Sequence, residues 1–195
     1  MDWIFHILQE MGLALRLPVS FVLIEFVGTF AFALSGVRLA SAKQFDIFGA
    51  WIVGMATAIG GGTMRDIMLG VNPFWMTNSS YFICCALAVL SVMFLGKYLI
   101  RVNNTWFIFD TIGLALFNVI GIEKTLNMGF PYWTAITMGS ITGAAGGVIR
   151  DVFINEVPLT FRKEIYAPAC VAGGVVYATC HYVGLPLEIT AMLRI

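Results

Sequence analysis

Long apolar stretches, separated by short polar or Pro/Gly-containing segments, follow one another along most of the chain. A bilayer core of roughly 30 Å is crossed by about 20 helical residues, and each stretch has close to that length. The pattern therefore predicts six membrane-spanning helices in a single membrane domain. The six stretches are Val19 to Val37, Ile47 to Leu69, Tyr81 to Ile100, Thr105 to Ile122, Tyr132 to Ile154 and Ile165 to Val183.

Composition points to the same class of protein. Hydrophobic residues make up 59% of the chain and charged residues 11%, and the mean hydropathy is +0.89, well outside the range of soluble domains. The 11 basic and 11 acidic residues cancel and form no basic patch, which argues against a nucleic-acid partner. We expect a multi-pass inner-membrane protein without a cleaved signal peptide, and an incomplete seventh helix at about residues 185–195.

The second half of the chain repeats the first at an offset of 85 residues, which indicates an internal duplication. Repeat one covers about residues 19–100 and repeat two about residues 105–183. Three spans per repeat is an odd number, so the second copy must enter the membrane from the opposite side. The matched positions include Gly61-Gly62 with Gly146-Gly147, Arg65-Asp66 with Arg150-Asp151, Pro73 with Pro158, and Tyr81 with Tyr166.

Basic residues gather on one side of this arrangement, which predicts a cytoplasmic face there, an outside N-terminus and, if the seventh helix is complete, a cytoplasmic C-terminus. On that side lie Arg38, Lys43, Lys97, Arg101, Arg162 and Lys163, against Arg16 and Lys124 on the other. Tyr81 and Tyr166 begin spans and are interpreted as interface anchors. Pro73 and Pro158 are expected to end the spans before them.

Two glycine-rich segments interrupt the second and fifth spans. The first contains Gly60, Gly61, Gly62, Thr63, Arg65 and Asp66, and its copy contains Gly146, Gly147, Arg150 and Asp151. Consecutive glycines each cost about 1 kcal/mol relative to alanine in a helix, so the runs favour unwinding. Unwound backbone at membrane depth lines protein or water, where its carbonyl groups can coordinate a cation. Thr57 and Thr142, one turn earlier, are candidates to cap those carbonyl groups or to line the path.

Close helix packing is the alternative explanation for the glycines. Gly54, Ala58 and Gly62 share a four-residue spacing, as do Gly139, Gly143 and Gly147. This spacing does not require Gly60, Gly61 or Gly146, which lie on other faces of the helices. We therefore predict functional breaks in both spans.

The arginines of the two segments should face the protein interior, since an arginine within a span costs on the order of 3 kcal/mol. Adjacent residues do not face each other on a helix. We therefore predict that Arg65 pairs with Asp151 and Arg150 with Asp66, across the repeats. Glu25 and Asp110 also correspond at the offset and are further candidates. Such pairs can staple the repeats together or line a pathway, and the sequence leaves both open.

Other chemistry has little support in the sequence. The chain lacks the motifs Gly-x-Ser-x-Gly and His-Glu-x-x-His and a phosphate-binding glycine loop, so no enzymatic function is expected. The four cysteines form no Cys-x-x-Cys pair and are interpreted as buried thiols. No metal site or cofactor is expected beyond permeant cations.

Paired Gly-Gly-x-x-Arg-Asp segments in a duplicated three-helix unit resemble the prokaryotic branch of the trimeric intracellular cation (TRIC) channels, a sequence family also labelled as glycine transporter domains. The resemblance implies a homotrimer with one potassium- and sodium-conducting pore in each subunit, a seventh C-terminal helix, and a constriction formed by the two glycine segments. Ala145 departs from the family pattern, since it replaces the first glycine of the second segment.

Three functions remain open on the sequence. A cation channel predicts passive flux that does not saturate, and family resemblance favours it. A secondary transporter of a small amino acid such as glycine predicts a saturable site, in which Arg65 or Arg150 binds the carboxylate. A purely structural scaffold predicts no transport and leaves the glycine segments unexplained.

Overall fold

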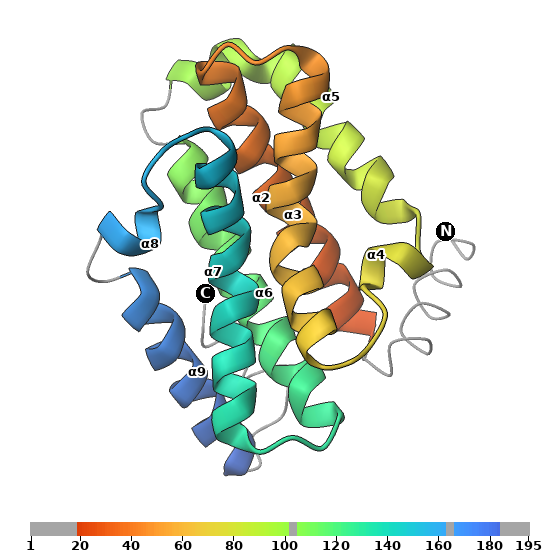
Figure 1. Cartoon of the computed structure of the whole chain (residues 1–195), viewed down its shortest axis with the longest axis vertical. Helices are drawn as coiled ribbons and strands as arrows, with labels where there is room; N and C mark the ends of the chain where they lie inside the picture. Colours follow the sequence, from red (N-terminus) through yellow and green to blue (C-terminus); the bar gives the residue numbers. More distant parts are fainter. Residues whose placement is uncertain (1–18, 102–104, 163–165, 184–195) are drawn as a thin grey trace.

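A computed structural model describes residues 19–101, 105–162 and 166–183 of the chain. Every regular element in these ranges is a helix, and the long helices pack into one bundle (Figure 1). The helices are α2 (Val19–Ala42), α3 (Ile47–Met68), α4 (Phe74–Thr77), α5 (Ser80–Arg101), α6 (Thr105–Asn127), α7 (Tyr132–Phe153), α8 (Leu159–Arg162) and α9 (Tyr166–Tyr182). The six predicted spans correspond to the six long helices. The predicted seventh helix, Arg16 and Lys163 lie outside the described residues.

Several helices have the length and apolarity that a membrane crossing needs. Within the described ranges these are Phe21–Ala42, Ile47–Met68 and Thr105–Asn127, and the apolar stretches Ser80–Gly96 and Pro168–Cys180 are shorter. Apolar side chains such as Phe94 and Trp133 point outward and are more than two-thirds exposed. This outer surface suits a lipid environment rather than water.

The two halves have the same order of helices, as the duplication predicts. The bounds of α7 and α8 lie 85 residues beyond those of α3 and α4, so the register read from the sequence is also the register of the structure. In Figure 1, α3 and α7 lie beside each other and run in opposite directions. The prediction of two inverted three-helix repeats is confirmed.

The predicted breaks at the glycine segments are wrong, because α3 and α7 continue without interruption through both of them. The glycines instead let the two backbones meet. A Cβ atom on Gly61 would lie 2.1 Å from the carbonyl oxygen of Thr142, and one on Gly146 would lie 2.4 Å from that of Thr57. Unwinding would expose backbone groups that lipid cannot satisfy, so close packing of intact helices wins over the weak helix propensity of glycine.

The same kind of contact joins the helices within each repeat. A Cβ atom on Gly36 of α2 would lie 2.5 Å from Thr57 Oγ1, and one on Gly121 of α6 would lie 2.6 Å from Thr142 Oγ1. The threonine hydroxyl groups donate to Val53 O at 2.6 Å and Met138 O at 2.5 Å, one turn back in their own helices. Thr57 and Thr142 are therefore packing positions in intact helices, and neither caps a carbonyl group freed by a break.

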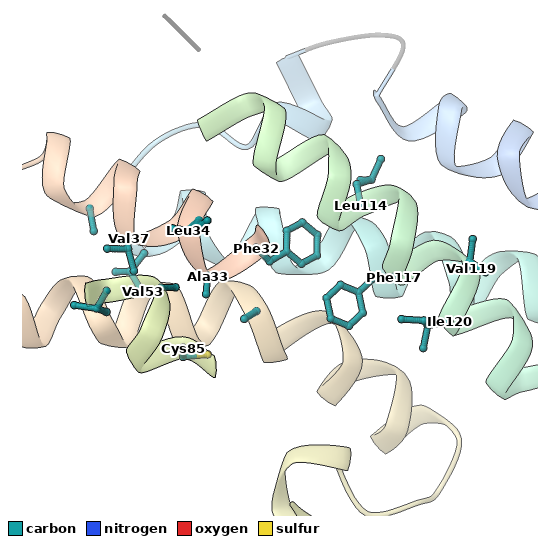
Figure 2. Packing of buried hydrophobic residues seen from close by; sticks show 14 of the residues in the cluster. Phe32, Ala33, Leu34, Val37, Val53, Cys85, Leu114, Phe117, Val119 and Ile120 are labelled. Atoms are coloured by element: carbon teal, nitrogen blue, oxygen red, sulfur yellow. The ribbon is translucent and has the colours of Figure 1, made fainter. Parts of the chain in front are cut away.

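Aromatic side chains fill the space where α2 meets α6. The rings of Phe32 and Phe117 stack with centroids 5.3 Å apart, as Figure 2 shows. The Phe117 ring lies against Gly28, which is four residues before Phe32. The Phe32 ring lies against Gly113, which is four residues before Phe117. The pair corresponds to itself at the 85-residue offset and so lies on the pseudo-twofold relation of the repeats.

The interpretation of Tyr81 as an interface anchor is wrong. Its side chain is 1% exposed and packs between the rings of Phe26, at 5.1 Å, and Phe74, at 4.6 Å. Helix α4 folds back after α3 and inserts Phe74 beneath the start of α5, which buries the tyrosine. The side chain of Tyr166 lies outside the described residues.

The α3–α7 contact predicts which glycines the fold requires. Gly61→Ala or Gly146→Ala should destabilise the protein by about 1–3 kcal/mol, the usual cost of overpacking, since a backbone carbonyl group is the obstacle. Thermal unfolding in detergent measures the effect. Gly96→Ala is the matched control, because a Cβ atom there meets nothing within 4 Å. Equal melting temperatures for all three variants would contradict the contact.

Candidate functional site

Two fully buried arginines lie one turn beyond the α3–α7 contact, Arg65 near the end of α3 and Arg150 near the end of α7. Each Nε atom donates to the aspartate next in sequence, from Arg65 to Asp66 and from Arg150 to Asp151, at 2.8 Å in both cases. The predicted pairs across the repeats, Arg65 with Asp151 and Arg150 with Asp66, are therefore wrong. Because α3 and α7 are antiparallel, each arginine lies toward the opposite end of the bundle from the other.

The prediction of pairs across the repeats is wrong because the direction in which a side chain leaves a helix does not by itself decide which group its far end reaches. An arginine side chain is long enough to turn back toward an adjacent aspartate, and α3 ends at Met68, which leaves room there. The second carboxylate oxygen of each aspartate accepts a backbone N–H from the loop that follows, Asp66 from Phe74 at 2.9 Å and Asp151 from Leu159 at 3.0 Å. Both aspartates therefore also fix the following short helix.

The cluster in repeat two closes around its arginine. Arg150 Nη1 donates to Asp110 on α6 and to Ser35 on α2, the latter at 2.7 Å. The guanidinium group also lies 5.6 Å from the centre of the Trp106 ring. Two buried carboxylates, those of Asp110 and Asp151, thus surround one buried guanidinium group. Such pairing is what makes a charge tolerable at membrane depth.

The cluster in repeat one has a different set of partners. Asp66 Oδ1 accepts both from Arg65 Nε and from Lys124 Nζ of α6, each at 2.8 Å. Glu25 of α2 is 2% exposed and interacts electrostatically with Arg65, Lys124 and Tyr81. The carboxylates of Asp66 and Glu25 therefore face the cations of Arg65 and Lys124, and the formal charges of these four side chains sum to zero.

The guanidinium group of repeat one is less completely bound than its counterpart. Among the described residues, no hydrogen-bond partner reaches Arg65 Nη1, Arg65 Nη2 or Glu25 Oε2, although all three atoms are buried. The difference follows from single residues. Ser35, which binds Arg150, corresponds to Ile120, and Lys124, which binds Asp66, corresponds to Leu39. Among the described residues, Arg150 has partners at both Nε and Nη1, whereas Arg65 has one at Nε alone. We therefore call the cluster around Arg150 the sealed cluster and the cluster around Arg65 the open cluster.

Sequence reasoning missed Lys124 of the open cluster and a buried carboxylate beside it in the chain. The predicted span stops at Ile122, before Lys124, but α6 continues to Asn127 and includes it. Glu123 lies in the same last turn, is buried, and accepts a hydrogen bond from the Tyr177 hydroxyl group of α9. Polar residues within one turn of the end of a span were the available signal for both.

The remaining predicted residues have structural contacts. Thr63 Oγ1 accepts a hydrogen bond from Trp75 Nε1 at 2.9 Å, a Cβ atom on Gly60 would meet the Ile149 side chain, and one on Gly62 would meet the Phe74 ring. Gly147 is buried in α7. Within the described ranges, no group of three or more His, Cys, Asp or Glu side chains is arranged to hold a metal ion.

Sequence comparisons support the duplication and identify relatives. A family model described as glycine transporter matches residues 22–97 and again 107–182, at the same 85-residue offset. The UPF0126 inner membrane protein YadS of Escherichia coli K12 is 40% identical over 174 residues, covering 87% of this chain and 84% of that protein. A UPF0126 membrane protein of Vibrio cholerae is 41% identical over 189 residues, covering 93% of this chain and 76% of the relative.

Solved structures of channels share the fold. The TRIC trimeric intracellular cation channel orthologue from Rhodobacter sphaeroides superposes with a TM-score of 0.83 and 32% identity, over 91% of this chain and 92% of that one. A prokaryotic TRIC channel solved in 0.5 M KCl gives a TM-score of 0.82 and 31% identity, over 89% and 90% of the two chains. With both halves matched by the family model, the chain belongs to the glycine transporter family of multi-pass membrane proteins and has the fold of the prokaryotic TRIC channels.

Proposed function

We propose that this protein is a channel for monovalent cations, potassium and sodium, with a pore in each subunit lined by α3 and α7. Likeness to the TRIC channels supports the proposal, and the sealed cluster of repeat two is the observation in this chain that carries it. There, among the described side chains, the carboxylates of Asp110 and Asp151 exceed the guanidinium group of Arg150 by one negative charge within a membrane-spanning bundle. Ionisable groups at membrane depth mark ion pathways, and an excess of carboxylate favours cations over anions.

The continuous helices change how such a pore is built. Because α3 and α7 keep their backbone hydrogen bonds through the glycine segments, the pathway passes side chains rather than freed carbonyl groups. The contact at Gly61 and Gly146 brings the backbones of the two helices together. The open and sealed clusters lie on either side of it, so a pathway along α3 and α7 is narrowest between two charged regions.

Assembly and orientation are part of the proposal. The Rhodobacter sphaeroides relative is a trimeric channel, and we propose a homotrimer in the inner membrane for this chain. Arg38, Lys43 and Arg162 share one end of the described bundle, which supports a cytoplasmic assignment for that end by the distribution of positive charge. The N-terminus then lies outside.

The first test is transport by purified protein in proteoliposomes. A potassium gradient with a clamped voltage should drive potassium flux that rises with concentration without saturating, because a pore binds its ion weakly. Uptake of radiolabelled glycine is measured on the same vesicles. Saturable glycine uptake without potassium flux would reject the channel, and absence of both would favour a structural scaffold.

The charge excess of the sealed cluster predicts a selective defect. Asp110→Asn removes one negative charge while keeping a side chain that can still hydrogen-bond Arg150, and should lower potassium flux per folded protein roughly tenfold, equivalent to about 1.4 kcal/mol. Ser35→Ala removes a neutral hydrogen bond to the same arginine and should leave flux within about twofold. Flux that falls only in proportion to folded yield in both variants would assign the cluster a purely structural role.

A second candidate function, transport of a zwitterionic amino acid such as glycine, is favoured by the open cluster. Among the described residues, Arg65 Nη1 and Nη2 have no hydrogen-bond acceptor and could donate to a carboxylate, and Glu25 Oε2 has no hydrogen-bond donor and could accept from an ammonium group. The four charged side chains of that cluster are balanced, which suits a ligand without net charge. The family description agrees with this function.

The transporter hypothesis makes its own prediction for the two arginines. Arg65→Lys keeps the positive charge but loses the paired donors, and should raise the KM for glycine about tenfold, the effect of one charge-assisted hydrogen bond. Arg150→Lys, at the sealed cluster, should lower the melting temperature without changing KM. Equal KM values for wild type and Arg65→Lys in a saturable uptake assay would exclude the open cluster as the substrate site.

A further inference from the structure

A cavity of about 180 Å³ lies between α2, α3 and α5, at the end of the bundle where α2 leads into α3 (Figure 1). Apolar side chains from all three helices form most of its wall, among them Val37, Val89 and Val92. Arg38, Ser41 and Asp46 add polar groups on one side. It is separate from both charged clusters, whose residues do not line it.

In repeat two, a side chain fills the position that corresponds to this cavity. Val92 corresponds to Tyr177 and Arg38 to Glu123. The Tyr177 ring is fully buried, and its hydroxyl group donates to Glu123, so the aromatic side chain occupies the space and satisfies the polar group. In repeat one the smaller Val92 leaves the space empty of side chains, and the polar group is a cation instead of a carboxylate.

One nitrogen atom of the Arg38 guanidinium group has no hydrogen-bond partner among the described residues. Arg38 Nε is buried and, among the described residues, has no hydrogen-bond acceptor. Asp46, which lines the same cavity, directs its Oδ1 atom to the N–H of Gly49 as the N-cap of α3, at 2.8 Å. A guanidinium group in a largely apolar pocket is stabilised by an anionic ligand with several acceptor oxygens.

The mouth of the cavity opens to the outside of the bundle among exposed apolar side chains. Ile47 and Met93 line it and are more than half exposed, and the neighbouring Phe45 is 40% exposed. A ligand that enters from this side therefore combines an anionic group for Arg38 with apolar chains that lie against these residues. The volume equals that of about six waters, enough for the region around a phosphate and too small for a whole lipid.

We propose that this cavity binds the phosphate and glycerol region of an anionic glycerophospholipid from the adjacent leaflet. The phosphate accepts from the guanidinium group of Arg38 and the hydroxyl group of Ser41, and the first methylene groups lie along Val89 and Val92. Inorganic phosphate offers the same acceptor oxygens, but it leaves the apolar wall uncovered. The site is independent of the proposed function, because it involves neither α7 nor the charged clusters.

Native mass spectrometry of the purified protein in mild detergent tests the site, with phosphatidylglycerol, phosphatidylcholine and inorganic phosphate as separate additives. Wild type should bind phosphatidylglycerol about fivefold more tightly than phosphatidylcholine, the factor expected from one basic residue at an anionic surface. Arg38→Gln should abolish that preference. Equal binding of the two lipids by wild type, or retention of inorganic phosphate instead of lipid, would overturn the proposal.

Two further variants distinguish lipid binding in the cavity from general electrostatic attraction of anionic lipid to the protein surface. Val92→Tyr places in repeat one the residue that repeat two carries, and should reduce phosphatidylglycerol binding at least fivefold while Arg38 stays in place. Lys43→Gln removes a nearby positive charge that pairs with Glu156 and does not line the cavity, and should keep the preference within about twofold. Loss of the preference in Lys43→Gln together with full binding by Val92→Tyr would assign the effect to surface charge and reject the cavity site.

Discussion

The close approach of α3 and α7 at Gly61 and Gly146 is the constraint on which the rest of the structure depends. Each glycine faces a backbone carbonyl group of the other helix, so any side chain there would force the helices apart. The contact joins the two repeats across their pseudo-twofold relation and fixes where the next turn of each helix lies. That turn carries Arg65 in one repeat and Arg150 in the other. The positions of both charged clusters therefore follow from a packing contact that contains no charge.

Duplication gave the protein two copies of this arrangement, and single substitutions have made them different. Both copies keep the arginine, the adjacent aspartate and the aspartate's hydrogen bond to the loop that follows. Ser35 and Asp110 complete the sealed cluster, while Lys124 enters the open one, where two nitrogen atoms of Arg65 have no hydrogen-bond partner among the described residues. A similar divergence separates Tyr177, which fills its position, from Val92, which leaves a cavity. The inverted symmetry therefore relates the backbones of the two repeats more closely than it relates the side chains of their clusters and cavities.

The sequence predicted the features that depend on local pattern or on self-similarity. Hydropathy located the six long helices, and the 85-residue offset predicted the inverted repeats and the corresponding positions of the Arg65-Asp66 and Arg150-Asp151 motifs. Prediction from the sequence failed where the role of a residue depends on a partner far along the chain. Whether Gly61 breaks a helix or packs it depends on Thr142, which no local pattern identifies, and whether Tyr81 anchors at an interface depends on how α4 folds back. Lys124 was missed because the end of an apolar run is not the end of a helix.

We propose that the charge excess beside the α3–α7 contact makes this fold conduct cations. The most direct measurement is the reversal potential of the purified protein in a planar bilayer under a tenfold potassium chloride gradient. A cation-selective pore should give a value near the potassium equilibrium potential, about 59 mV in magnitude, with the sign for cation permeation. A reversal potential near zero or of the opposite sign would contradict it.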